Sequence, residues 1–244
     1  MAQIVNLPTM YINGCNLIYG NGTTINVTAG QVRDSSNQFD IVIPNPLVIN
    51  STTKGINGLD TGSLGNNLFY NIYIVSDSSG FRPAGAILSL SSSGAPLLPV
   101  GYDLIRLIGI WLTGGSATLV NIAQTGQGND RTFFYDVPIP VLTAGVATSF
   151  TPVNLSAAVP NICRLIELNA AYTPAAVNNI FALRPTGSTS SATVRQNGIV
   201  ATVEQDIQVQ IPVLLASGNP SIDYMVTASG DALTLNVSAF NISL

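Results

Sequence analysis

Hydrophobic and polar residues alternate with a period of two along much of this 244-residue chain. The clearest examples are residues 69–75, which read FYNIYIV, and residues 199–211, which read IVATVEQDIQVQI. Successive side chains of a β-strand point to opposite faces, so this period predicts strands with one buried face. Further short strands are predicted at residues 16–19, 24–28, 39–43, 104–113, 118–123, 162–168, 221–227 and 233–240.

Turn residues separate these predicted strands, and helix signals are nearly missing. The 22 glycines and 14 prolines are spread between the strands and do not cluster. Lysine and glutamate, which favour exposed helix positions, occur only as Lys54, Glu167 and Glu204. Many short strands at close spacing are typical of sandwiches and barrels, so we expect an all-β fold.

A polar, glycine-containing segment, QTGQGND at residues 124–130, follows one of the predicted strands and indicates a domain boundary. The chain length suits either one large β domain or two smaller ones. We therefore predict two β-sandwich or barrel-like domains in series, residues 1–126 and residues 127–244, with a single domain as the alternative.

Charged residues make up 8% of the chain, against about 25% in a typical soluble protein. The 12 acidic and 8 basic residues are scattered, which argues against nucleic acid as a partner. No apolar stretch approaches the roughly 20 residues that cross a bilayer, so we expect no membrane partner. A surface with so few charges is poorly protected against self-association, which favours a component of an assembly. The N-terminal MAQIVNLP lacks the features of a secretory signal, so folding in a cytoplasm is expected.

The chain contains no histidine, the commonest general base and metal ligand. Ser-His-Asp, Cys-His and zinc-hydrolase sites are therefore excluded. We expect a protein that is not an enzyme, with no catalytic, cofactor-binding or metal-binding residues and no cofactor. Cys15 and Cys163 match no metal-ligand spacing, and we interpret them as buried free thiols, with a long-range disulfide as the alternative.

One short string resembles the signature of aspartic proteases: residues 59–63, Leu-Asp-Thr-Gly-Ser. A single copy would require a homodimer in which two copies of Asp60 share a proton. The preceding residues 54–58 form a predicted loop, however, where those enzymes have an apolar strand. We favour a polar turn in which Asp60 accepts backbone hydrogen bonds and Gly62 supplies an unusual φ, and keep the Asp60-Thr61-Gly62 protease as the enzymatic alternative.

Two turns contain clustered oxygen ligands of the kind that bind Ca²⁺. Asp34 lies near Asp40, and Asp77 lies beside Ser78 and Ser79. Both turns lack the D-x-D-x-D-G spacing of a dedicated calcium loop, so hydrogen-bonded turns are the preferred interpretation.

Aromatic residues gather in one predicted strand, at Phe69, Tyr70 and Tyr73. They could line a sugar-binding site. Aromatic residues in a strand more often pack in the core or pair across strands, and we prefer that interpretation.

Five strings follow one another along the first half: GQVRDSSN at 30–37, GLDTGSL at 58–64, FYNIYIV at 69–75, LPVGY at 98–102 and RLIG at 106–109. In this order they resemble a small β domain of tailed-phage and prophage virion proteins, over roughly residues 10–125. The second half resembles, in general texture, the β-sandwich that often accompanies that domain. The resemblance makes 58–64 a connector into the next strand and offers no catalytic residues. Related sequences often carry a second basic residue around Arg106, where this chain has Leu107.

Composition and resemblance together predict a non-enzymatic virion protein, assembled in the host cytoplasm as a homotrimer. The expected partners are copies of itself and the major capsid or tail proteins. No shaft or coiled-coil repeat is present, which favours a capsid decoration or head-fibre protein. The alternative is a tail-tip or tail-fibre protein that contacts a host receptor or glycan through loops of the second domain.

Overall fold

The computed structural model describes residues 10–91, 94–216 and 218–244; the N-terminal octapeptide examined for a signal lies outside them. The described residues form strands and turns without an α-helix, which confirms the all-β prediction. Within this part of the chain, no helix is long and apolar enough to cross a membrane.

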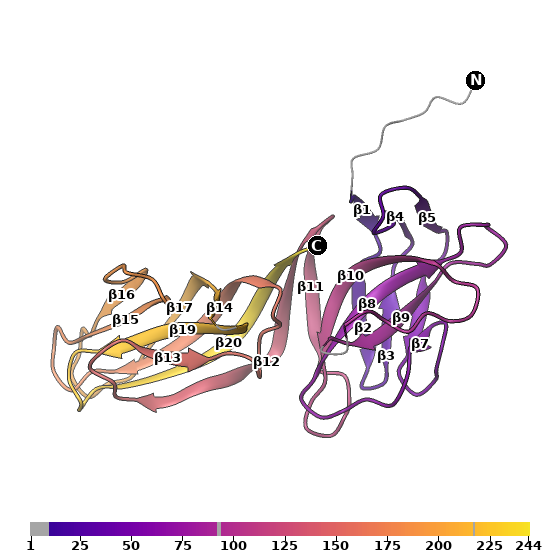
Figure 1. Cartoon of the computed structure of the whole chain (residues 1–244). Coiled ribbons are helices and arrows are strands. Elements are labelled where there is room, and N and C mark those ends of the chain that lie inside the picture. Colours follow the sequence, from indigo (N-terminus) through magenta and orange to yellow (C-terminus); the bar gives the residue numbers. More distant parts are fainter. Residues whose placement is uncertain (1–9, 92–93, 217) are drawn as a thin grey trace. The chain divides into compact units, whose positions relative to one another are not determined.

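The chain divides into two compact units, coloured from indigo to yellow along the sequence in Figure 1. The N-terminal unit comprises residues 1–131 with Leu244, and the C-terminal unit comprises residues 132–243. The division falls a few residues after the predicted boundary at 126/127. The segment 124–130, taken from the sequence to mark the boundary, forms the end of one strand, a turn and the start of the next.

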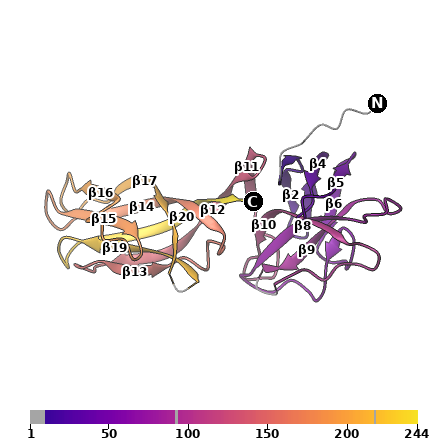
Figure 2. The ribbon, with the colours of Figure 1, turned by 45° about the horizontal axis from the view of Figure 1, so that its top comes forward.

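The N-terminal unit contains strands from three sheets (Figures 1 and 2). One has the order β1-β4-β5, which are Ile12–Gly14, Gly30–Arg33 and Asp40–Ile43. A second has the order β10-β8-β9-β7, which are Leu104–Leu112, Phe69–Ser76, Gly85–Leu90 and Gly58–Leu59. The third contributes β11-β2-β3-β6, which are Ile122–Gln127, Leu17–Asn21, Thr24–Val27 and Leu47–Asn50. Pairing is antiparallel except between β7 and β9.

Two large buried side chains mark the core of the N-terminal unit. Trp111 on β10 is fully buried, and its indole N–H donates to the Val120 carbonyl at 2.9 Å. Arg131, equally buried, donates from its guanidinium to the backbone carbonyls of Gly14, Cys15 and Ile108. A buried cation therefore lies in this core, and most of its hydrogen-bond acceptors are backbone carbonyl oxygens.

The C-terminal unit is a two-layer sandwich. One layer has the order β17-β14-β20-β12, which are Gln205–Pro212, Cys163–Thr173, Ala232–Ser243 and Asp130–Gly145. The other has the order β13-β19-β15-β16, which are Thr151–Asn154, Asn219–Val226, Ile180–Pro185 and Val194–Asn197, with β18 (Leu214–Ala216) paired to β19. Tyr172 on β14 meets Phe181 on β15 edge to face, with ring centroids 5.2 Å apart, which joins the two layers in one core.

A buried carboxylate fastens two loops of this sandwich. Asp231 accepts hydrogen bonds from the Tyr172 hydroxyl (3.1 Å), the Asn179 amide (2.7 Å) and the backbone N–H groups of Ala175 and Ala228 (2.7 and 3.0 Å). Burial alone would raise the pKa of Asp231, but these hydrogen bonds outweigh burial and hold it below its usual value.

Two predicted strands begin several residues later than the alternation indicated. β17 starts at Gln205 rather than at residue 199, because Thr202 has a left-handed φ of 60° and donates its N–H to Pro174. β11 starts at Ile122 rather than at residue 118, and the stretch before it makes one isolated bridge, Thr113 to Leu119. The alternation of hydrophobic and polar residues indicates which side chains would lie on the same face of a strand. The residue at which strand pairing begins depends on the backbone conformation, which this alternation does not reveal.

Cys15 and Cys163 are buried free thiols, which confirms the preferred interpretation of the sequence. Burial raises the thiol pKa to about 11 for Cys15 and to about 12 for Cys163. Because the thiolate is the reactive form, we expect neither cysteine to react with iodoacetamide at pH 8 in the folded protein, and both to react in guanidinium chloride. Mass spectrometry counts the adducts. Complete labelling of the native protein within minutes would contradict this expectation.

Candidate binding face of the C-terminal unit

The protease-like string forms a turn directly after β7. The Asp60 carboxylate accepts the backbone N–H of Thr61 at 2.7 Å and that of Leu97 at 3.1 Å. Gly62 has a φ of 69°, the left-handed conformation that favours glycine. Asp60 therefore fastens the loop around Leu97 to the end of β7, as the polar-turn interpretation predicts.

The first calcium candidate separates into two unrelated interactions. Asp34 is buried, and its carboxylate accepts three backbone N–H groups from residues 36–39 at 2.7–2.8 Å. Burial would raise the pKa of Asp34, but these bonds and that of the Ser36 hydroxyl lower it below the usual value. Asp40 forms an ion pair with Arg33 at 2.8 Å. The two carboxylates therefore serve a capped turn and a surface pair.

The second calcium candidate lies in the loop after β8. One Asp77 oxygen accepts the Arg82 N–H at 2.8 Å, while the backbone N–H and hydroxyl of Ser78 donate to Asp103 at 2.7 and 2.6 Å. Among the residues that the structure describes, no group of three or more acidic or cysteine side chains could hold a metal ion.

The aromatic strand belongs mainly to the core. Phe69 and Tyr70 on β8 are buried, and the Tyr70 hydroxyl accepts the Gly65 N–H at 2.8 Å. Tyr73 is partly exposed, and its hydroxyl accepts a hydrogen bond from the Asn71 amide at 3.2 Å. No flat aromatic platform results at these three positions.

A polar face emerges instead on the outer side of the sheet β17-β14-β20-β12. Ile166, Leu168 and Ala170 of β14 point into the sandwich core, and the alternate residues Glu167 and Asn169 point outward. The register of β14 with β17 and β20 determines which side chains lie beside Glu167 and Asn169.

Two rows of polar side chains cross this face. In one row Asn169 lies opposite Gln208 on β17 and Asn236 on β20. In the other, Glu167 lies opposite Gln210. We call these side chains the amide rows: Gln208, Asn169 and Asn236 in one, Gln210 and Glu167 in the other.

Glu167 fixes the neighbouring amides. Its carboxylate accepts hydrogen bonds from the side-chain amides of Gln208 and Gln210, one on each oxygen, and from the Ser238 hydroxyl at 3.3 Å. Each glutamine amide retains a carbonyl oxygen and a second N–H, which take part in no described hydrogen bond. The face thus offers oriented donors and acceptors to solvent.

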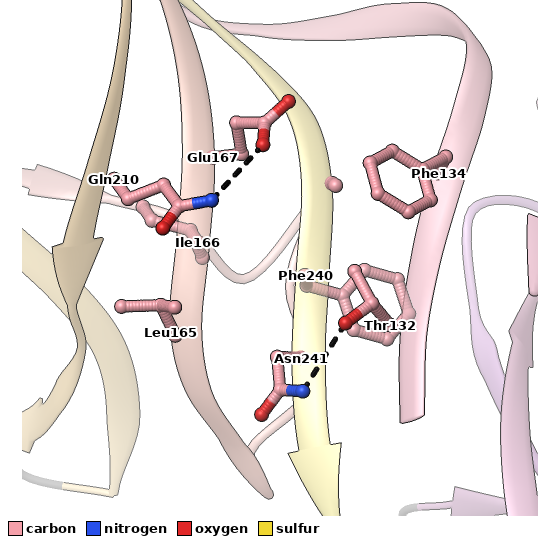
Figure 3. Close-up of a pocket in the computed structure, with 9 residues that line it drawn as sticks. Thr132, Phe134, Leu165, Ile166, Glu167, Gln210, Phe240 and Asn241 are labelled. Carbon is pink, nitrogen blue, oxygen red and sulfur yellow. Dashed lines mark hydrogen bonds between the residues drawn. The ribbon is translucent and has the colours of Figure 1, made fainter. Parts of the chain in front are cut away.

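A hollow of about 130 Å³ opens beside the amide rows (Figure 3). Its polar lining includes Glu167, Gln210 and Asn241, and the Asn241 amide donates to the Thr132 hydroxyl at 3.2 Å. In Figure 3 Phe134 lies on one side of β20, and Glu167 and Gln210 lie on the other. A second hollow, which Asn169, Gln208 and Asn236 help to line, continues along the other row.

Sequence reasoning did not single out this face. The predicted strand at 199–211 places Gln208 and Gln210 on one face, but the predicted strand at 162–168 contains Glu167 and ends before Asn169. The register between the strands was needed to bring these side chains together.

No protein-family model matches the sequence, and no curated protein is detectably similar to it. Several solved structures show faint likeness, among them the three that follow. The carbohydrate binding module CBM6cm-2 from Cellvibrio mixtus lichenase 5A in complex with cellotriose is 14% identical, over 51% of this chain and 87% of that one, with a TM-score of 0.23. The crystal structure of the infectious bursal disease virus VP2 subviral particle is 11% identical over 97% of this chain and 72% of that one, with a TM-score of 0.24. The structure of the Gx strain of infectious bursal disease virus is 12% identical over 98% of this chain and 69% of that one, with a TM-score of 0.23. At such TM-scores these likenesses carry no argument.

Proposed function

We propose that the protein is a non-enzymatic structural component of a tailed-phage virion, a homotrimer displayed outside the particle as a capsid decoration or head-fibre protein. The supporting observation is apolar surface on a chain with few charges. Phe81 is 91% exposed, Val100 90% and Leu97 63%. The loops that carry Phe81 and Val100 are neighbours, because the Arg82 guanidinium lies 5.8 Å from the centre of the Tyr102 ring.

Burial of these side chains against a second subunit would favour association. Each Å² of apolar surface removed from water contributes about 25 cal/mol, and large exposed apolar patches commonly mark interaction sites. Copies of the chain and the major capsid or tail proteins are the proposed partners.

The oligomeric state tests this proposal directly. We expect light scattering at micromolar concentration to give the mass of a trimer, and the Phe81→Ser/Val100→Ser variant to dissociate at least tenfold more readily. Val42→Ser, at an exposed position on β5, is the matched control. A monomeric wild-type protein would overturn the trimer. Cleavage of a general peptide substrate that is lost in Asp60→Asn would overturn the non-enzymatic assignment.

A tail-tip or tail-fibre protein that contacts the host is the second candidate, and the amide rows with their adjoining hollow favour it. Purified protein added to particles that lack it, followed by electron microscopy, distinguishes the candidates. Density on the capsid supports decoration, and density at the tail supports host contact.

A further inference from the structure

We infer that the outer face of β17-β14-β20-β12 binds a neutral oligosaccharide, through the amide rows and the adjoining surface of Phe134. This inference rests on the second candidate function, contact with a host surface, and names the class of ligand that the face would take.

The chemistry of the amide rows matches sugar hydroxyl groups. A hydroxyl group both donates and accepts hydrogen bonds, as the side-chain amides of Gln208, Asn169 and Asn236 do. Neighbouring strands lie about 4.8 Å apart, so three side chains in one row extend over about 10 Å. A row of this length can contact hydroxyl groups on more than one sugar ring.

The orientation of the amides is set before a ligand arrives. Glu167 accepts one N–H from each of Gln208 and Gln210, which restricts the rotamers of two otherwise mobile exposed side chains. Ordering such side chains costs conformational entropy during binding, and the carboxylate reduces this cost in advance. The amide carbonyl oxygens and remaining N–H groups are then available to the ligand.

The charge of the face selects a neutral ligand. The two hollows include the carboxylates of Glu167 and Asp206 among their lining residues, together with amides, hydroxyls and apolar groups, and no lysine or arginine. Sialylated glycans, uronic acids and nucleic acids would meet two like charges without a compensating cation. Uncharged sugars incur no such repulsion.

An apolar surface adjoins the polar rows. Phe134 on β12 is partly exposed and lines the first hollow with Leu165 on β14 (Figure 3). Ligand sites commonly combine apolar and aromatic walls with a few oriented polar groups. In an oligosaccharide, the C–H face of one ring can pack on Phe134 while hydroxyl groups of a following ring reach toward Gln210, which lies on β17 at the other side of the sheet.

A glycan array tests the ligand class with the full-length, fluorescently labelled protein. We expect binding to neutral oligosaccharides and weaker binding to their sialylated or uronic-acid counterparts. Absence of binding to every neutral oligosaccharide on the array, or a preference for the acidic ones, would overturn the inference.

Variants then test the location of the site. Isothermal titration with the best neutral oligosaccharide should show at least tenfold weaker binding for Gln208→Ala/Gln210→Ala, and for Asn169→Ala as an independent variant. Gln38→Ala/Gln127→Ala, which removes two exposed glutamines from the N-terminal unit, should bind like wild type. Unchanged affinity in both site variants would overturn the inference.

Light scattering on the same variants separates the two proposals. If the Gln208→Ala/Gln210→Ala protein keeps its oligomeric state but no longer binds the oligosaccharide, the proposed trimer and the proposed glycan site are both supported. If it loses its oligomeric state, the face is a contact between subunits and the glycan inference falls. The Phe81→Ser/Val100→Ser variant should lose the trimer but still bind the oligosaccharide. That result would support the assembly surface without affecting the glycan inference.

Discussion

Replacement of Arg131 with methionine is expected to lower the free energy of unfolding of the N-terminal unit by about 2–6 kcal/mol. Arg131 donates to the buried carbonyls of Cys15 and Ile108 at 2.9 and 2.8 Å. Methionine fills much of the same volume but has no donor. Each buried carbonyl left without a partner costs about 1–3 kcal/mol, which gives the expected range.

The same guanidinium also reaches less buried acceptors. It donates to the backbone carbonyls of Gly14 and Gly128 at 3.0 and 3.1 Å and to the Gln124 side chain at 3.3 Å. Burial lowers the pKa of Arg131 to about 10, so it stays charged at neutral pH. Lysine lacks the planar fork that serves so many acceptors at once, and we expect Arg131→Lys to destabilise the unit as well.

Trp111 provides the measurement, because it is the single tryptophan of the chain and is buried in the same unit. Urea unfolding followed by its fluorescence should show an earlier midpoint for Arg131→Met and an unchanged midpoint for Arg195→Ala, at an exposed position. Equal midpoints for wild type and Arg131→Met would show that the backbone carbonyls find other donors.

Acid is expected to destabilise the C-terminal unit through Asp231, and Asp231→Ala is expected to cost about 3 kcal/mol or more at pH 7. The folded state lowers the pKa of this carboxyl below its unfolded value of about 3.9. Its contribution is therefore complete above the unfolded pKa and is lost as the pH falls through the folded pKa. The Tyr172 hydroxyl and the Ala228 N–H share one carboxylate oxygen, and Ala175 and Asn179 share the other, so a proton on either oxygen weakens two of these hydrogen bonds directly.

Pulsed hydrogen exchange in increasing urea, read on peptides from β14 and β20, follows this unit separately. Between pH 5 and pH 2 the wild type should lose stability more steeply than Asp231→Asn, which is already weakened at pH 7. Asp136→Asn, an exposed position on β12, is the control and should follow the wild type. Parallel pH profiles for wild type and Asp231→Asn would contradict the role of this carboxylate.

The fold class followed from the sequence because a period of two is visible wherever one face of a strand is buried. The predicted strand at 69–75 corresponds to β8, Phe69–Ser76, and that at 104–113 to β10, Leu104–Leu112. β9, Gly85–Leu90, was missed, because five of its six residues are buried and it shows no alternation. Strand edges set by backbone φ, as at Thr202, also leave no mark in the hydrophobic pattern.

The candidate site could be predicted from the sequence less well than the fold class. Glu167 and Gln210 are far apart along the chain and meet only through the register of β14 with β17. The string around Asp60 attracted attention because its residues are contiguous, yet its carboxylate holds a turn. Contiguous motifs can be found in one sequence, whereas a face built across several strands requires the pairing.

The hydrogen-bond partners of the buried charges determine how the stability of the fold depends on ionic strength. Arg131 is held by carbonyl oxygens, and Asp34 largely by backbone N–H groups, at short range and away from solvent. Dissolved ions screen exposed charge pairs over about 10 Å at 0.1 M salt, but they do not enter such contacts. The free energy of unfolding should therefore change little between low and high salt.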